Sequence, residues 1–233
     1  MSQKKHIFCA LDFSDLKKTI EFTNIIKDHV GGIKLGLEFF CKYGPNGIEK
    51  LKKFHLPIFL DLKLHDIPNT VKSTVRNLMD LSPEYLTVHI SGGSKMINEL
   101  KEIKNKTKII GVTMLTSLDK SDLNEFGINL DEQTYVNNLV RIGMKSGIDG
   151  VVASPIEIKN IKLNFSDLIY VTPGIRLPNQ STDDQKRVNT PGFAIKSGSS
   201  ILVIGRPITQ SENPISTINQ ILLNIDNEKK IKN

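Results

Sequence analysis

The chain has 233 residues, of which 39% are hydrophobic and 24% charged, so it has enough apolar side chains to bury a full core. No apolar run approaches the roughly 20 residues that span a bilayer, and the N-terminal sequence turns acidic early, so we expect a cytoplasmic protein without membrane segments. The net charge is +6, but Lys and Arg are scattered among 25 acids and Trp is absent, which argues against nucleic-acid binding. Cys9 and Cys41 have no second Cys or His at ligand spacing, which argues against a disulfide framework or a zinc cluster.

Short apolar or β-branched runs recur along the whole chain at intervals suited to alternating strands and helices. The predicted strands cover residues 6–12, 31–37, 57–64, 85–90, 108–115, 150–154, 168–174 and 200–206. Helix-like stretches between them include residues 14–28, with Ser14 as N-cap, 69–81, 131–146 and 211–225. Eight such units without a linker predict an α/β protein, a single-domain (β/α)8 TIM barrel over residues 1–233, rather than a doubly wound sheet.

Three of the predicted strands carry charges, although parallel strands are normally covered by apolar layers on both faces. In residues 57–64, alternation places the aliphatic side chains on one face and Asp61 and Lys63 on the other. The same alternation turns Lys34 inward from the second strand and Asp12 inward from the first. Because these positions lie near the C-terminal ends of three adjacent strands, the four charges are expected at the end of the barrel where active sites occur.

A purely structural salt-bridge cluster is the alternative for these four charges. Removing ions from water costs several kcal/mol per ion, which their mutual attraction only roughly offsets, so stability alone would favour Val or Ile there. A functional site is therefore the preferred interpretation of the cluster. Asp12 considered alone fits a capping role equally well, and Asp66, on the turn before Pro68, taken alone fits a helix-entry Asp better than a catalytic one.

The ends of the seventh and eighth predicted strands suggest a phosphate site. The seventh is followed by Arg176 and a long polar segment, and the eighth ends in Gly205 and Arg206. Barrels commonly bind phosphate in the loops after these two strands, where glycine permits close approach and Arg supplies a fork of donors. A glycine turn with a surface Arg is the alternative.

Taken together, these motifs resemble those of the orotidine 5′-phosphate decarboxylase family. The segments that carry the resemblance are, in order, ALDFSD, GGIKLG, FLDLKLHDIPNT, VHISGG, VTMLTS, VTPGIR and VIGRPIT. The Asp-x-Lys-x-x-Asp pattern of the third strand is shared with related sugar-phosphate barrels. Its combination with IPNT, VTPGIR, Gln185 and GRPIT is much more specific, and it covers most of the chain.

The resemblance implies a cofactor-free and metal-free homodimer that converts orotidine 5′-phosphate to uridine 5′-monophosphate and CO2, with active sites at the subunit interface. It implies a charged network of Lys34, Asp61 and Lys63, completed by Asp66 of a neighbouring subunit, in which Lys63 donates the proton. The other implied substrate contacts are Asp12 with Lys34 at the ribose, Thr70 across the interface, Thr116 at the pyrimidine, and Arg176, Gln185, Gly205 and Arg206 at the phosphate or its loop.

Two other functions are kept as alternatives. A magnesium-dependent sugar-phosphate decarboxylase or aldolase shares the third-strand motif, but such enzymes resemble one another in having a Glu metal ligand at the second strand. This chain has Lys34 there, and a charged Lys cannot bind magnesium. A non-catalytic nucleic-acid-binding protein is the other alternative, and it leaves the inward-facing charges unexplained.

Overall fold

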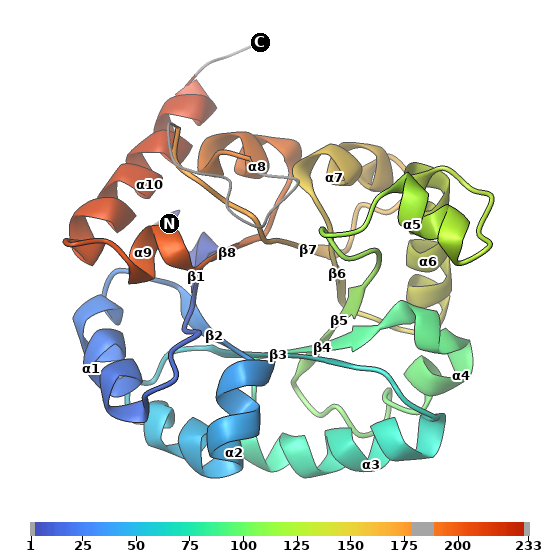
Figure 1. Cartoon of the computed structure of the whole chain (residues 1–233), viewed down its shortest axis with the longest axis horizontal. Coiled ribbons are helices and arrows are strands. Elements are labelled where there is room, and N and C mark those ends of the chain that lie inside the picture. Colours follow the sequence, from blue (N-terminus) through green and yellow to red (C-terminus); the bar gives the residue numbers. More distant parts are fainter. Residues whose placement is uncertain (1–2, 179–188, 231–233) are drawn as a thin grey trace.

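The computed structural model describes residues 3–178 and 189–230, and their eight strands form a closed parallel barrel in the order β1 to β8. Figure 1 looks into the barrel, with the helices arranged around its outside. The strands are β1 (Ile7–Ala10), β2 (Gly32–Gly36), β3 (Ile58–Leu64), β4 (Tyr85–His89), β5 (Lys108–Val112), β6 (Gly150–Val152), β7 (Ile169–Thr172) and β8 (Ile201–Ile204). Each strand falls within a predicted run, which confirms the (β/α)8 barrel.

Helices α1 to α8 connect successive strands, α9 and α10 follow β8, and together they cover the barrel. They are α1 (Leu16–Ile26), α2 (Leu37–Lys52), α3 (Pro68–Leu78), α4 (Gly93–Asn98), α5 (Lys120–Glu125), α6 (Glu132–Lys145), α7 (Pro155–Lys162), α8 (Pro191–Ser197), α9 (Arg206–Thr209) and α10 (Pro214–Lys230). Short 3₁₀ turns lie at Gln3–His6, Met79–Leu81 and Ile90–Gly92. None of the helices in the described ranges is both long enough and apolar enough to cross a membrane.

The N-terminus of α1 differs from the expectation. Asp15 caps this helix, not Ser14, because the Asp15 carboxylate accepts a hydrogen bond from the Lys18 backbone N–H at 2.7 Å. A carboxylate at this position satisfies an otherwise unpaired N–H of the first turn and also interacts favourably with the helix dipole. The prediction of Ser14 as the cap was therefore wrong by one residue, since both side chains can cap and only the backbone path distinguishes them.

The barrel has two apolar layers that together position the charged residues. Outward-facing side chains of the strands pack under the helices, and a separate inner cluster of Phe8, Phe59, Ile110, Val171 and Ile201 fills the lumen. Phe8 also packs edge-on against Tyr85, with ring centroids 5.5 Å apart. Because these rings come from the early part of each strand, they close the lumen below the charges at the C-terminal ends.

Gly32 on β2 allows this inner cluster to form, and its replacement should destabilise the protein. A Cβ at position 32 would lie 2.2 Å from a ring atom of Phe8, and that ring is held by its edge-on neighbours. We expect Gly32→Ala to lower the free energy of unfolding by about 1–3 kcal/mol, the usual cost of overpacking. Thermal unfolding followed by circular dichroism measures this, and a midpoint within about one degree of the parent's would contradict it.

Candidate active site

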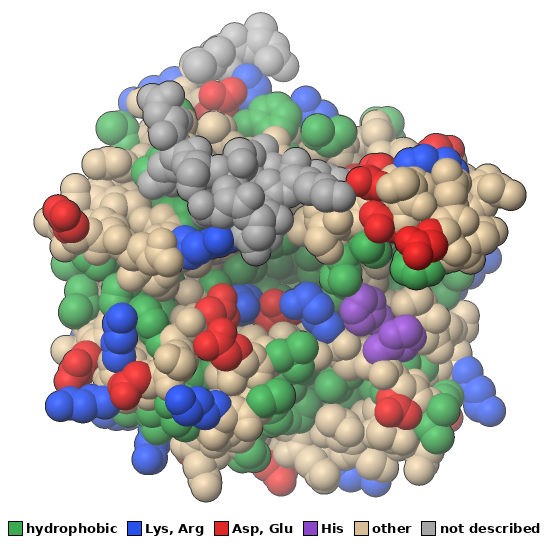
Figure 2. Space-filling model, viewed as in Figure 1, with side chains coloured by type: hydrophobic (Ala, Val, Ile, Leu, Met, Phe, Trp, Pro, Cys, Tyr) green, Lys and Arg blue, Asp and Glu red, His purple; other side chains and the backbone are tan. Residues whose placement is uncertain are grey.

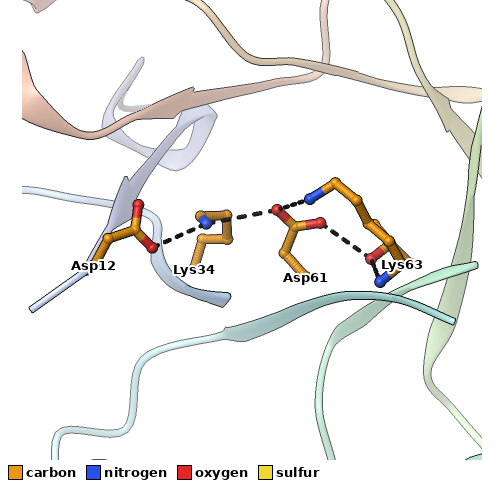
Figure 3. Close-up of polar contacts among 5 residues, drawn as sticks. Asp12, Lys34, Asp61 and Lys63 are labelled. Atoms are coloured by element: carbon orange, nitrogen blue, oxygen red, sulfur yellow. Dashed lines mark hydrogen bonds and ion pairs between the residues drawn. The ribbon is translucent and has the colours of Figure 1, made fainter. Parts of the chain in front are cut away.

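Four charged side chains form a continuous chain across the C-terminal ends of the first three strands. Asp12 Oδ1 lies 3.3 Å from Lys34 Nζ, Lys34 Nζ lies 3.5 Å from Asp61 Oδ2, and the same Asp61 oxygen lies 2.8 Å from Lys63 Nζ. Figure 3 shows the alternation of acid and base along this chain. The four residues that strand alternation turned inward are therefore brought into direct contact.

The four side chains of this charged chain differ in burial, and the difference decides which of them are held most firmly. The side chains of Lys34 and Asp61 are 10% and 15% exposed, whereas those of Lys63 and Asp12 are 33% and 49% exposed. The two central groups are thus removed from water and depend on each other for compensation, since an unpaired buried charge is costly. Lys63 keeps access to the open end of the barrel, where a substrate can reach its ammonium group.

Gly36, at the end of β2, leaves the space that the Lys34 ammonium occupies. A Cβ at position 36 would lie 3.0 Å from Lys34 Nζ and 3.4 Å from Asp12 Oδ1. A side chain there would push the ammonium away from Asp12. The last glycine of the GGIKLG segment is therefore explained by the close approach of a charged side chain.

Lys63 departs from regular strand geometry. Its φ is +48°, in the left-handed region that few non-glycine residues adopt. The pairing of β3 with β4 also shifts here, from Leu60 opposite Leu86 to Leu64 opposite Val88. The prediction that inward-facing and outward-facing side chains alternate regularly through residue 64 was thus incomplete, because a bulge changes the direction of the Lys63 side chain. Strained backbone of this kind persists where the surrounding structure holds it, and it is concentrated at functional sites.

The neighbouring ammonium groups of the charged chain keep the Asp61 carboxylate ionised. Burial by itself would raise the pKa of Asp61, but the nearby Lys34 and Lys63 ammonium groups and hydrogen bonds from Lys63 and Thr87 outweigh it. The pKa of Asp61 is therefore held below its usual value. The ionised Asp61 carboxylate is in direct contact with the Lys63 amine, with Oδ2 and Nζ 2.8 Å apart.

A pocket opens beside Lys63 and extends across the lumen. Asp61, Lys63 and Thr116 supply its polar atoms. The other lining residues are Phe59, Val112, Met114, Leu115, Val152, Val171, Pro173 and Val203. Figure 2 shows this side of the molecule, with basic and acidic side chains gathered near its centre, next to hydrophobic side chains in the central hollow. Apolar walls with a charged edge suit a flat ring that carries an anionic group on one side.

Two histidines beside the charged chain were not identified from the sequence. The rings of His65 and His89 are tilted with centroids 5.3 Å apart, and histidine side chains are visible next to the central charges in Figure 2. Burial, followed by the proximity of His65 and Lys63, lowers the pKa of His89, and Asp61 opposes this. His89 is therefore neutral near neutral pH. Period-two alternation from Tyr85 would have placed it on the inward face.

Three other predicted residues lie around this site in different ways. Thr116 lines the pocket with Asp61 and Lys63. Asp66 and Thr70 are both exposed, one on the turn after β3 and the other in the first turn of α3. The Asp66 carboxylate accepts a hydrogen bond from the Ile67 backbone N–H at 2.6 Å. Among the described residues of one chain, Lys34 pairs with Asp12 and Asp61, Lys63 pairs with Asp61, and Asp66 takes part in none of these ion pairs.

Three of the four predicted phosphate residues, Arg176, Gly205 and Arg206, lie just after the ends of β7 and β8. Arg176 is 8% exposed, and its guanidinium donates to the Ile175 carbonyl at 3.0 Å. Gly205 precedes α9, and Arg206 is the first residue of that helix and half-buried. Gln185 lies outside the described residues. Arg176 and Arg206 thus both lie at the C-terminal side of the barrel, which is where a phosphate site is predicted.

Comparison with known proteins identifies the family. Residues 5–221 match the model of the orotidine 5′-phosphate decarboxylase / HUMPS family. The chain belongs to this family. It is 48% identical to the orotidine 5′-phosphate decarboxylase of Wolbachia pipientis subsp. Culex pipiens (strain wPip), over 93% of this chain and 96% of that protein.

Other relatives agree with this assignment. The chain is 43% identical to the orotidine 5′-phosphate decarboxylase of Fusobacterium nucleatum subsp. nucleatum, over 91% of this chain and 92% of that protein. Among solved structures, the orotidine 5′-phosphate decarboxylase of Lactobacillus acidophilus superposes with a TM-score of 0.82 at 35% identity, covering 94% of this chain and 98% of that one. The resemblance inferred from the motifs is confirmed, and so is the barrel.

Proposed function

We propose that this protein decarboxylates orotidine 5′-phosphate to uridine 5′-monophosphate and CO2, the last step in the synthesis of that pyrimidine nucleotide, with Lys63 as the proton donor. The observation that carries the proposal is the Lys63 ammonium at the edge of an apolar pocket, 2.8 Å from a buried carboxylate, in a chain of this family. The reaction belongs to the carbon–carbon lyases.

The chemistry explains why an ammonium is needed there. The bond between C6 of the pyrimidine and the carboxylate carbon breaks, CO2 leaves, and the electron pair stays on C6. The Lys63 ammonium stabilises that negative charge and then transfers a proton to C6, after which the amine regains a proton from solvent. Two opposite unit charges about 4 Å apart attract by about 4 kcal/mol at an effective dielectric constant of 20, so placing the ammonium in advance has a large effect.

The other residues receive roles from the same proposal. Asp61 orients the Lys63 amine, and Lys34 balances the charge of Asp61. Asp12 and Lys34 bind the ribose hydroxyls, and Thr116 contacts the pyrimidine. The phosphate is held by the loops after β7 and β8; the residues assigned to it are Arg176, Gln185, Gly205 and Arg206. Phosphate binding far from C6 supplies energy that closes these loops over the substrate.

Assembly forms part of the proposal as well. The active unit is a homodimer in which Asp66 and Thr70 of one subunit reach the site of the other. Both residues are exposed, Asp66 on the turn after β3 and Thr70 in the first turn of α3, and this exposure supports the arrangement. A cytoplasmic location is also proposed, because the substrate carries a phosphate group whose charge prevents free passage through a bilayer.

The direct test is turnover of orotidine 5′-phosphate in the presence of a metal chelator. We expect the loss of orotate absorbance to proceed at the same rate with and without EDTA. The reason is the set of side chains at the site. Asp61 is flanked by two ammonium groups. Lys34 occupies the second-strand position at which the related sugar-phosphate enzymes share a metal-binding Glu. Abolition of activity by EDTA and its rescue by magnesium would contradict the proposal.

A further inference from the structure

One fully buried hydroxyl group lies opposite the bulge that carries Lys63. Thr87 is in the middle of β4 and is 0% exposed. Its Oγ1 lies 2.8 Å from the Lys63 backbone nitrogen and 3.0 Å from Asp61 Oδ1. Both of these residues belong to the charged chain, and they are separated by only one residue of β3. The Thr87 hydroxyl therefore contacts both the backbone of Lys63 and the side chain of Asp61.

The bulge explains why the Lys63 N–H needs this partner. Between the pairs Leu60–Leu86 and Leu64–Val88, β3 advances by four residues while β4 advances by two. Such a mismatch takes backbone groups out of the regular ladder and leaves them to be satisfied in another way. A buried N–H without an acceptor costs about 1–3 kcal/mol. The Thr87 oxygen supplies that acceptor, and so it supports the unusual backbone of Lys63 at φ +48°.

The direction of the two hydrogen bonds is determined by the groups involved. A backbone N–H can only donate, so Thr87 Oγ1 accepts from Lys63. The single hydroxyl hydrogen is then available for Asp61, whose ionised carboxylate can only accept. This pattern of donors and acceptors is consistent with an ionised Asp61. Asp61 Oδ1 is held by Thr87, which leaves Oδ2 for the two ammonium groups of Lys63 and Lys34.

We propose that Thr87 is a positioning residue for the decarboxylation, whose hydroxyl group fixes the backbone of Lys63 and the carboxylate of Asp61 relative to each other. The Lys63 side chain is long and flexible, and its ammonium must stay at the pocket edge to meet charge that develops at C6. Two anchors restrict it: the bulged backbone at its base and the carboxylate at its tip. Thr87 holds both anchors through one oxygen atom.

This inference rests on the proposed role of Lys63 in the reaction. Preorganised groups accelerate a reaction because they need not reorganise as charge develops. Loss of the Thr87 hydroxyl should therefore affect turnover more than substrate binding, since the phosphate and ribose contacts lie elsewhere. Hydrogen bonds to charged groups typically contribute enough to change a rate on the order of tenfold to a hundredfold.

The test compares Thr87→Val, which keeps the branched shape without the hydroxyl, with Thr87→Ser, which keeps the hydroxyl. We expect kcat of Thr87→Val to fall on the order of tenfold to a hundredfold, with KM changed by less than about threefold. Thr87→Ser should retain kcat within about threefold of the parent, because its oxygen can make both hydrogen bonds. Thr87→Ala, also without the hydroxyl, repeats the comparison with a different shape.

Thr172→Val is the matched control. Thr172 is also a 0% exposed threonine on a barrel strand, but its hydroxyl contacts the Ala153 carbonyl at 3.2 Å and Ser199 Oγ at 2.7 Å. Neither partner belongs to the charged chain. Thr172→Val should lose stability comparable to Thr87→Val, measured by thermal unfolding, without the drop in kcat. Lys63→Ala is assayed in parallel, because substantial turnover by that variant would contradict the role of Lys63 itself rather than that of Thr87.

Three outcomes would overturn the inference. Thr87→Val and Thr87→Ala could both retain kcat within about twofold of the parent, well below the loss expected of a hydrogen bond to a charged group. Thr87→Ser could lose as much activity as Thr87→Val, which would show that the hydroxyl group is not the reason. Failure of both hydroxyl-free variants to fold, with Thr87→Ser folded, would show that the hydroxyl holds the strands together rather than positioning the charged groups.

Discussion

Lys63→Ala and Asp66→Asn should each be nearly inactive, and a mixture of the two should recover about one quarter of the parent activity when they are refolded together. In a twofold-symmetric dimer of the two variants, one site combines the intact Lys63 of one chain with the intact Asp66 of the other. The second site lacks both. Random assortment makes about half of all dimers mixed, each with one good site of two.

The exposure of Asp66 and its position on the turn between β3 and α3 motivate this experiment. Lys34, Asp61 and Lys63 are joined within one chain, whereas Asp66 follows the strand end and leads into α3. The two variants are unfolded, mixed and refolded, and their activity is compared with that of each variant refolded alone. Mass spectrometry verifies that mixed dimers have formed.

A matched control uses two residues that the structure places in the same site of one chain. Lys63→Ala mixed with Asp61→Asn should show no recovery, because Lys63 and Asp61 are in direct contact within a chain and each mixed dimer then has one defect in each site. Activity that stays at the single-variant level for the Lys63 and Asp66 pair, despite mixed dimers, would mean that Asp66 acts within its own chain. The shared-site proposal would then be wrong.

Arg206→Ala should lower kcat/KM for orotidine 5′-phosphate on the order of a hundredfold and leave kcat/KM for the nucleoside orotidine nearly unchanged. A contact made only with the phosphate cannot assist a substrate that lacks it, and charge-assisted hydrogen bonds from Arg are among the strong ones. Arg206 begins α9 directly after β8, which is where barrels commonly bind phosphate. Steady-state assays with the two substrates measure the difference.

Arg141→Ala is the control for the loss of positive charge. Arg141 is exposed on α6, and its guanidinium donates to Asn138 on the same helix. Its replacement should change neither substrate's kcat/KM. Equal proportional losses for both substrates with Arg206→Ala would show that Arg206 is not the phosphate ligand.

The charged chain was predictable because barrel strands have a simple period. Alternation alone turned Asp61 and Lys63 to the same side of β3 and Lys34 to the same side of β2, and adjacent parallel strands then brought them together. The apolar runs were equally clear, since each strand must pair with its neighbours and be covered on both faces. The family resemblance added the chemistry.

The bulge at Lys63 and its contact with Thr87 were not predictable in the same way. They depend on the register between β3 and β4, which is set by how two distant segments pack, and no local pattern in either segment encodes it. The His65 and His89 pair also forms only when β4 is placed beside the turn after β3. The role of Asp66 depends on a second subunit, so only an experiment with mixed chains tests it.

The sequence by itself therefore determined the barrel, the order of its strands and the four inward-facing charges, because these follow from local periodicity and from the rule that charges are not buried without compensation. Tertiary structure alone decided how the charges are held: the left-handed backbone of Lys63, the space beside Gly36 and the shared hydroxyl of Thr87. These features arise where strands meet, and the energy of a contact between strands depends on a register that neither strand specifies alone.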